Sequence, residues 1–317
     1  FWLKPFASKP RSRSLLRTMS AGPMRIIRFV GDDGGIYYGE EPKAGEESAT
    51  VLSGDPFEAG LARTAETRKV AKLLAPVKPT DIFCIGLNYM KHYEESAKKR
   101  GLPPPERPVI FMKPSSALVH PGEEVWVPQL AHGEELDWEV ELAVVMGKAC
   151  RGVKKEEALQ YVLGYTVAND VSSRHWQKAA GAGQWIKGKS FDGFCPLGPA
   201  LVTAEAIPDP QTLRVQTRVN GETQQDSNTA DMIFTCAEII AWLSDNMTLL
   251  PGTVILTGTP AGVAAGREPP NWLKAGDVME TEISQIGVLR NTVAAPPPDA
   301  QAAAEVARRL APGKPKL

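Results

Sequence analysis

Two glutamates separated by a single residue, Glu139 and Glu141, are the side chains in this sequence best suited to hold an ion together. They lie within residues 136–146, an apolar run that we expect to form a β-strand. Successive side chains of a strand point to opposite faces, so the two carboxylates share one face. The opposite face is apolar and comprises Leu136, Trp138, Val140, Leu142 and Val144. Neighbouring carboxylates repel each other unless a proton or a cation separates them, and their oxygens suit a hard divalent cation.

A third acid follows the next strand-like run. Residues 161–168 are apolar and rich in β-branched and aromatic side chains, and Asn169 and Asp170 follow them at the start of a polar loop. Binding groups commonly lie on loops that a rigid scaffold positions, so Asp170 is the third candidate ligand. Taken alone, an E-x-E pair is more often a solvated pair on an exposed strand, and Asp170 shifts the balance towards an ion site.

The elements that must position these acids indicate two folded parts. We expect a basic leader at residues 1–23, a small N-terminal lobe at 24–78, a catalytic domain at 79–293 and an Ala/Pro-rich tail at 294–317. The small lobe should hold short strands and one helix. The large domain reads as a β-rich α+β fold without regular βαβ spacing, with helices near 89–100, 154–162 and 236–246. The tail should form a helix with Asp299 as its N-cap, outside the core.

Composition excludes several classes of protein. The 317 residues include 36 Lys and Arg against 37 Asp and Glu, a formal net charge of -1, and no basic stripe that would favour nucleic acid. No apolar run reaches the roughly 20 residues that cross a bilayer, so we expect no membrane span. Four cysteines without a C-x-x-C pair predict free, buried thiols in a reducing compartment; they are Cys84, Cys150, Cys195 and Cys236.

Two further segments carry a signal. Residues 1–23 contain basic residues and serines but no acid, which is the composition of a mitochondrial transit peptide. Residues 183–190 satisfy the phosphate-loop pattern G-x-x-x-x-G-K-[ST], but they lack the preceding buried strand and the following helix that bring backbone amides to a phosphate. We therefore reject nucleotide binding and retain Lys189 as a cation near the ion site.

Several motifs in order along the chain resemble the fumarylacetoacetate hydrolase family, over about residues 80–293. The resemblance rests on Gly86-Leu87-Asn88-Tyr89, His92 with Glu95, Glu139-x-Glu141, the segment 169–174 with Gln177, the segments 189–192 and 196–199, and Leu256-Thr257-Gly258-Thr259-Pro260. The chain looks most like the mitochondrial branch of that family that includes oxaloacetate tautomerases.

The resemblance implies a mixed β-roll or sandwich and a homodimer. It also implies Mg²⁺ or Mn²⁺ held by Glu139, Glu141 and Asp170, with a site near charge -1 once the ion is bound. The remaining site residues that it implies are Lys189, Gln177 and Thr259 against the substrate, and His92 with Glu95 as an acid–base pair on a lid segment. The three-residue spacing of this pair agrees, since such positions face the same way on a helix.

Two positions depart from the family pattern. Fumarylacetoacetate hydrolase itself carries another metal-site carboxylate before its histidine, whereas residues 84–91 contain no acid, which argues against fumarylacetoacetate as the substrate. His175 stands where relatives commonly have Asp, and its role is open.

The implied chemistry starts from a small 2-keto acid or 1,3-dicarbonyl substrate that chelates the cation. Polarisation of the keto oxygen makes the adjacent C3 proton acidic and stabilises an enolate. Proton return gives tautomerisation, loss of CO₂ gives decarboxylation, and attack of water cleaves an acylpyruvate. We expect an oxaloacetate tautomerase in the mitochondrial matrix, or otherwise in the cytoplasm. The alternatives are an acylpyruvate hydrolase or oxaloacetate decarboxylase at the same site, or a non-catalytic, metal-dependent dicarboxylate binder.

Overall fold

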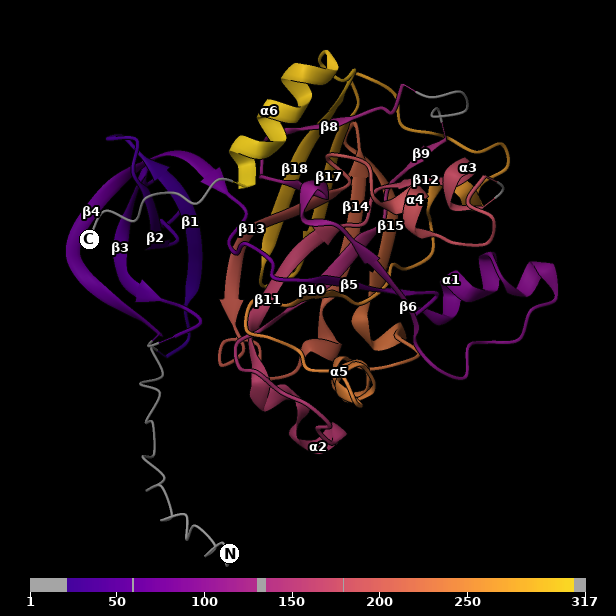
Figure 1. Cartoon of the computed structure of the whole chain (residues 1–317), viewed down its shortest axis with the longest axis horizontal. Helices are drawn as coiled ribbons and strands as arrows, with labels where there is room; N and C mark the ends of the chain where they lie inside the picture. The colour runs from indigo at the N-terminus through magenta and orange to yellow at the C-terminus, as the bar shows by residue number, and fades with distance from the viewer. Residues whose placement is uncertain (1–21, 59, 130–134, 179, 311–317) are drawn as a thin grey trace, which may run out of the picture.

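The described residues of the N-terminal part form a lobe of four strands joined by turns. The computed structural model describes residues 22–58, 60–129, 135–178 and 180–310, and Figure 1 shows the lobe beside the larger part of the molecule. Its strands are β1 (Arg25–Gly31), β2 (Ile36–Glu40), β3 (Ser48–Asp55) and β4 (Gly60–Leu74). The helix that we expected in this lobe is absent from its described residues. Instead β4 pairs with β3 and with β1, so sheet hydrogen bonds satisfy its backbone.

The lobe and the large domain share one sheet, because β1 pairs with β13 (Cys195–Thr203). Eleven strands take part, in the order β2-β3-β4-β1-β13-β11-β10-β16-β5-β6, with β7 added beside β13. The members in the large domain are β5 (Ile82–Gly86), β6 (Val109–Lys113), β7 (Leu118–Val119), β10 (Val140–Met146), β11 (Val162–Asn169) and β16 (Val254–Leu256). Every residue of β10 is buried, as expected of a strand that is covered on both faces.

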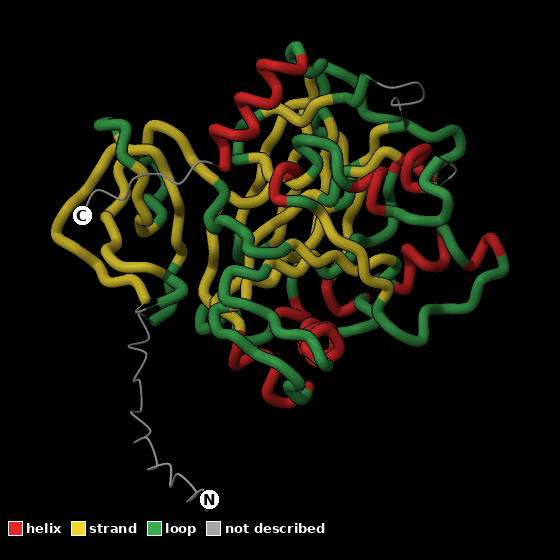
Figure 2. The backbone as a smooth tube through the Cα atoms, viewed as in Figure 1, coloured by secondary structure: helices red, strands yellow, loops and turns green. Residues whose placement is uncertain are grey.

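A second sheet of five strands, in the order β15-β14-β17-β18-β8, packs against β10, β11 and β13. Its strands are β8 (Glu124–Trp126), β14 (Arg214–Val219), β15 (Glu222–Asn228), β17 (Val278–Ile283) and β18 (Gly287–Ala294). Figure 2 shows that strands make up the centre of the large part and that helices lie around it. The β-rich α+β fold with a small N-terminal lobe is therefore confirmed.

All three helices expected in the large domain are present but short. They are α1 (Met90–Glu95), α2 (Lys155–Ala158) with a 3₁₀ turn at Leu159–Tyr161, and α5 (Cys236–Ser244). Two further short helices, α3 (Arg174–Gln177) and α4 (Ile186–Lys189), were not expected. Other 3₁₀ turns lie at Lys98–Arg100, Ser115–Ala117, Pro210–Thr212, Thr229–Asp231 and Ala264–Gly266.

The tail forms α6 (Asp299–Leu310), in which Asp299 is the first helical residue rather than the N-cap. Our expectation that the tail lies outside the core is wrong for one face of this helix. The Arg309 side chain is buried, its guanidinium stacks on Trp126 at 4.8 Å from the ring centroid, and it pairs with Glu123 at 2.9 Å. Cation–π and ionic contacts of this kind fix an amphipathic helix against the domain.

The run 136–146 departs from the single strand that we expected. It divides into β9 (Leu136–Asp137), which pairs with β12 (Ser172–Ser173), and β10, with Trp138 and Glu139 between them. Side chains replace the sheet bonds at this break, because the Glu139 N–H donates to Asn169 Oδ1 at 2.9 Å and the Val140 N–H donates to Gln225 Oε1 at 3.1 Å. The apolar face is consequently split between two hydrophobic clusters.

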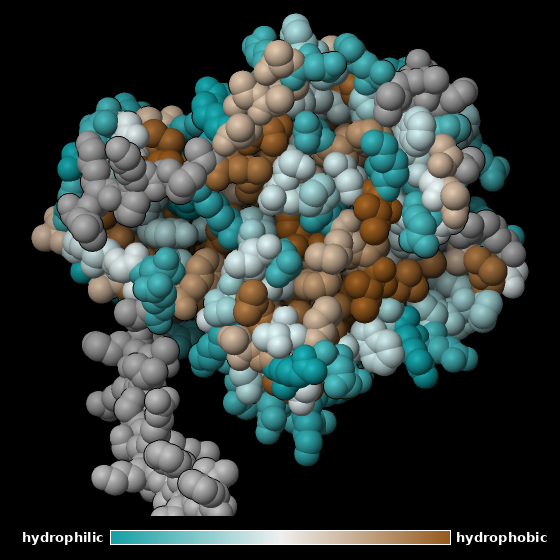
Figure 3. Space-filling model, viewed as in Figure 1, coloured by the Kyte–Doolittle hydropathy of each residue, from teal (hydrophilic) through white to brown (hydrophobic). Residues whose placement is uncertain are grey.

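An exposed edge strand, the lengths of the helices and the state of the cysteines complete the description of the fold. β6 lies at the end of the eleven-stranded sheet and, among the residues that the structure describes, pairs only with β5. Its Ile110 and Met112 are exposed, and Figure 3 shows apolar surface in that region. No helix in the described ranges is both long and apolar enough to cross a membrane. The four cysteines are buried and free, as predicted.

Candidate metal centre and active site

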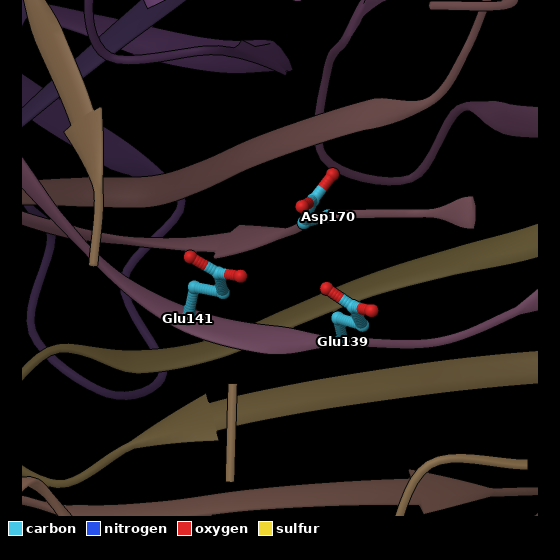
Figure 4. A group of neighbouring side chains, drawn as sticks. All are labelled: Glu139, Glu141 and Asp170. Carbon is cyan, nitrogen blue, oxygen red and sulfur yellow. The ribbon is translucent and has the colours of Figure 1, made fainter. Parts of the chain in front are cut away.

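Glu139, Glu141 and Asp170 converge on one point. Each offers a carboxylate oxygen, and these oxygens lie within 4.8 Å of one another. Strand pairing explains the convergence: β10 runs antiparallel to β11, with Val140 opposite Asn169, and the Asp170 N–H donates to the Glu139 carbonyl at 2.8 Å. Figure 4 shows the three side chains facing one another at neighbouring strand ends. All three are buried.

Lys189 lies between two of these acids. Its Nζ donates to Glu139 Oε2 at 2.8 Å and to Asp170 Oδ2 at 2.6 Å. The side chain is buried, and although burial lowers its pKa, Asp170 and Glu139 outweigh that effect and raise the pKa above its ordinary value. The residue retained from the rejected phosphate loop is thus a permanent cation beside the acid cluster.

A second buried lysine was missed by the sequence analysis. Lys113 Nζ pairs with Asp170 Oδ1 at 2.6 Å and donates to the carbonyls of Val171, Lys189 and Phe194 at 3.0, 2.6 and 2.8 Å. Little in the sequence indicated that Lys113 is buried. It lies two residues after Phe111 in β6, so both side chains share the inward face of this strand.

Arg174 and Asp137 complete the ionic network. Arg174 Nε pairs with Asp137 Oδ2 at 2.7 Å, and Arg174 Nη1 pairs with Glu139 Oε1 at 2.7 Å. Asp137 also accepts hydrogen bonds from the backbone N–H groups of Ala264 and Ala265, at 2.7 and 3.0 Å. Both residues lay within segments that we quoted, but no role had been predicted for either.

The network leaves one carboxylate without a cation. Four buried acids (Asp137, Glu139, Glu141, Asp170) face three buried cations (Lys113, Arg174, Lys189), and among the described residues no lysine or arginine pairs with Glu141. Burial raises the pKa of Glu139, but Lys189 and Arg174 outweigh it and bring that pKa down to about 2. Burial, Asp170 and Glu139 together raise the pKa of Glu141 well above its ordinary value.

This donor set fits a divalent cation. Three buried carboxylate oxygens within reach of one another are ligands that Mg²⁺ and Mn²⁺ accept. The raised pKa of Glu141 reflects the missing positive charge, since a proton otherwise has to separate the acids. Counted over the whole network, a bound divalent ion brings the formal charge from -1 to +1. The charge of -1 expected for the loaded site counted only the ion and its three ligand carboxylates; the value of +1 applies to the wider network, which adds Asp137, Lys113, Arg174 and Lys189.

His92 and Glu95 lie on α1 and line the same cavity as Glu139 and Glu141. His92 Nδ1 contacts Glu95 Oε1 at 2.7 Å, and the Glu95 carboxylate accepts the Gly262 N–H at 3.1 and 3.2 Å. The cavity has a volume of about 380 Å³, and Glu139, Glu141 and Lys189 line it. Its apolar wall is formed by Ile85, Leu87, Phe111, Trp185 and Val263.

Gln177 and Thr259 also line the cavity, whereas His175 does not. Gln177 Oε1 accepts a hydrogen bond from Arg174 Nη1 at 2.9 Å. Thr259 Oγ1 accepts one from Gln225 Nε2 at 2.8 Å, and Gln225 was another residue that the sequence did not reveal. The His175 ring packs edge-to-face on Trp176, with 5.6 Å between ring centroids.

Comparison with known proteins identifies the family. The model described as fumarylacetoacetate hydrolase C-terminal matches residues 81–294. The chain belongs to this family. A second model, described as Rv2993c-like, N-terminal, matches residues 24–76. The family assignment made from the sequence motifs is confirmed.

Relatives within the family include tautomerases and isomerases. Oxaloacetate tautomerase fahd2, mitochondrial, from Xenopus laevis is 48% identical over 228 residues, 72% of this chain and 70% of that protein. Oxaloacetate tautomerase FAHD2A, mitochondrial, from Homo sapiens is 47% identical over 227 residues, 71% and 70% of the two chains. A crystal structure of 2-hydroxyhepta-2,4-diene-1,7-dioate isomerase from Mycobacterium marinum matches with a TM-score of 0.73 and 36% identity, over 86% of this chain and 98% of that one.

Proposed function

We propose that the protein is a divalent-metal-dependent oxaloacetate tautomerase. The observation that carries the proposal is the buried cluster of Glu139, Glu141 and Asp170, whose two glutamates line a cavity that His92 and Glu95 also line. The similarity to mitochondrial oxaloacetate tautomerases supports the choice of substrate. We keep Mg²⁺, or Mn²⁺, as the proposed cofactor because both accept all-oxygen ligands.

The charges of the site suit an anionic 2-keto acid. With a divalent ion the buried network carries a formal charge of +1, so it attracts a carboxylate rather than repelling it. A cation held by the three acids would act as a Lewis acid and make the C3 proton of the keto acid easier to remove. Lys189 keeps its charge beside Glu139 and Asp170, so its remaining N–H can donate to a substrate oxygen.

Proton transfer falls to His92 in this proposal. His92 Nδ1 lies 2.7 Å from Glu95 Oε1, and in the neutral tautomer whose Nδ1–H donates to this carboxylate, Nε2 carries no proton and can take one up. The Gly262 N–H fixes Glu95, so the imidazole is oriented by a carboxylate that is itself held in place. His92 would remove the C3 proton or return it, while Gln177 and Thr259 orient the substrate from the cavity wall.

An acylpyruvate hydrolase is the second candidate. The cavity of about 380 Å³ falls within the range of pockets that hold drug-sized ligands, and its apolar wall suits an acyl chain better than a second carboxylate. An oxaloacetate decarboxylase would use the same groups.

Three further expectations remain proposals. They are the homodimer, a mitochondrial location, and the division into a leader at 1–23, a lobe at 24–78, a catalytic domain at 79–293 and a tail at 294–317. Most of the leader lies outside the described residues.

Two assays separate the enzymatic candidates. Enol-oxaloacetate absorbance and pyruvate release are followed together with Mg²⁺ present, and acylpyruvates are tested for release of carboxylic acid. Rapid loss of the enol without pyruvate supports the tautomerase, whereas stoichiometric pyruvate indicates decarboxylation. Glu141→Gln should abolish turnover, while the surface control Glu282→Gln, which alters only a pair with Arg218, should not. Full activity of Glu141→Gln after chelation would refute the site. A protein that binds oxalate but turns over nothing would be a binder.

A further inference from the structure

Asn88, in the segment that follows β5, is a fully buried amide that ties three chain segments together. Its Nδ2 donates to the carbonyls of Thr257 and Phe234 at 2.7 and 3.0 Å, and its Oδ1 accepts the Phe234 N–H at 2.8 Å. Its own carbonyl accepts the Ile233 N–H at 2.8 Å. Asn88 is absent from the cavity lining, so it does not act by touching the substrate.

One of these bonds reaches the acid cluster through a single peptide group. The Thr257 carbonyl and the Gly258 N–H belong to the same peptide plane and point in opposite directions. Asn88 Nδ2 holds the carbonyl end at 2.7 Å, and the Gly258 N–H donates to Glu141 Oε2 at 2.5 Å. Among the described residues this is the only hydrogen bond made by the Glu141 carboxylate. The direction of that peptide plane therefore decides where Glu141 points.

The Thr257–Gly258 peptide needs a hydrogen bond from another segment to fix its orientation, because Gly258 is conformationally flexible. Gly258 has φ +101°, which side chains rarely tolerate, and a Cβ at this position would come within 2.7 Å of Asn88 Cβ. Glycine permits peptide orientations that other residues forbid, so the same feature that admits the close approach also leaves the plane free to rotate. A rotated plane would turn the Thr257 carbonyl towards Glu141, and two oxygens would then face each other.

We propose that Asn88 is a positioning residue of the metal centre, which acts through the Thr257–Gly258 peptide to hold Glu141 in its ligating orientation. Thr257 supports the same arrangement from the other side, because its N–H and its hydroxyl both bond to the Leu142 carbonyl, at 3.1 and 2.8 Å. A donor–peptide–carboxylate chain also polarises each of its members, which strengthens the final bond. The inference rests on the proposed metal site and extends it to a residue outside the cavity.

Asn88→Asp tests the proposal with almost no change in volume. It replaces the amide donor by an oxygen that repels the Thr257 carbonyl, so Mn²⁺ affinity measured by calorimetry should fall by about 10- to 100-fold, as for other partners of metal ligands. Asn291→Asp is the matched control, because this buried amide also donates to two carbonyls, of His120 and Glu123, but has no link to Glu141. Equal Mn²⁺ affinity in Asn88→Asp and in the wild type would overturn the proposal, and so would an equal loss in both variants.

A spectroscopic readout covers the case in which Asn88→Asp does not fold. Asn88→Ser removes the same donor without adding a charge, and [¹⁵N]glycine labelling reports the Gly258 amide directly. The short bond to a carboxylate should place the Gly258 amide proton downfield, and Asn88→Ser and Glu141→Gln should each shift it upfield. A resonance that Asn88→Ser leaves in place overturns the proposal. Unchanged Mn²⁺ affinity in Glu141→Gln would instead refute the metal centre itself, and with it the inference.

Discussion

Replacing Lys189 by methionine should make the protein bind metal more tightly and turn over substrate more slowly. Methionine conserves most of the side-chain volume and removes only the ammonium that bridges Glu139 and Asp170. Both acids keep a second cation, since Arg174 pairs with Glu139 at 2.7 Å and Lys113 pairs with Asp170 at 2.6 Å. The variant should therefore fold, with a loss of about 3 kcal/mol in unfolding free energy, the low end for a broken buried ion pair.

The size of the affinity change follows from the geometry. Lys189 Nζ lies 2.6 to 2.8 Å from carboxylate oxygens that would hold an ion at roughly 2.1 to 2.4 Å, which puts the two cations about 4 to 5 Å apart. At an effective dielectric constant near 20, the repulsion between the ammonium and a doubly charged ion amounts to about 7 to 8 kcal/mol. Protonation of the freed acids will absorb part of this. We therefore expect Mn²⁺ affinity to rise by at least about tenfold, equivalent to about 1.4 kcal/mol.

Calorimetric titration with Mn²⁺ and the enol assay on the same preparation test both halves of this prediction. Turnover should fall by about 10²-fold or more, because a charged donor to the substrate is lost. Lys72→Met is a suitable control, since this lysine pairs with Glu123 far from the acid cluster and should change neither quantity. Weaker Mn²⁺ binding in a folded Lys189→Met protein would refute the reasoning, because it would mean that Lys189 supports the ligands more than it competes with the ion.

Three other changes have defined outcomes. Replacing His92 by Asn should cut turnover by about 10²- to 10⁴-fold without altering Mn²⁺ affinity, because His92 lies outside the ligand set; a parallel loss of metal binding would contradict this. Gly86→Ala places a Cβ 2.2 Å from the Trp185 ring, so we expect a loss of about 1 to 3 kcal/mol in urea unfolding and a raised KM, and Trp185→Leu in the same protein should relieve both. Burial lowers the pKa of His120 to about 4, and its Nδ1 accepts the Ala75 N–H. As the pH falls, His120 is therefore protonated in the unfolded chain at a higher pH than in the folded protein. The stability contributed by neutral His120 is complete above about pH 6.5 and about 3 kcal/mol should be lost by pH 4; His120→Gln, which can still accept the Ala75 N–H, should flatten this slope.

The acids of the site were predictable because local sequence encodes them. Glu139 and Glu141 follow the two-residue period of a strand, and Asp170 directly follows β11, which pairs with β10. Periodicity and chain order were therefore enough to suggest a common site. The three residues also fall within family motifs, which supplied His92 and Glu95 as partners. Such features can be predicted from the sequence because each depends on only a few neighbouring residues in the chain.

The residues that were missed come from contacts between distant segments. Lys113 reaches Asp170 from β6, and Gln225 reaches the Val140 N–H from β15, at sequence separations that no spacing rule covers. The break between β9 and β10 has the same origin, because the Gln225 and Asn169 side chains take over the backbone N–H groups there. The helix expected in the N-terminal lobe is not found among its described residues, where strand pairing such as that of β4 with β3 and β1 determines the structure.

The missed cations change the interpretation of the acid pair itself. A buried network of seven charged groups is costly to form, and well-packed apolar residues of similar volume would often be as stable or more so. In this network Asp137, Glu139 and Asp170 each pair with at least one lysine or arginine. Glu141 accepts a hydrogen bond only from one backbone N–H among the described residues. The unbalanced charge is thus localised on one ligand, whose orientation depends on a glycine peptide. Metal binding, the orientation of Glu141 and the net charge presented to an anionic substrate are consequently coupled, so a change at Lys189 or Asn88 should alter all three, whereas a change at His92 should alter none of them.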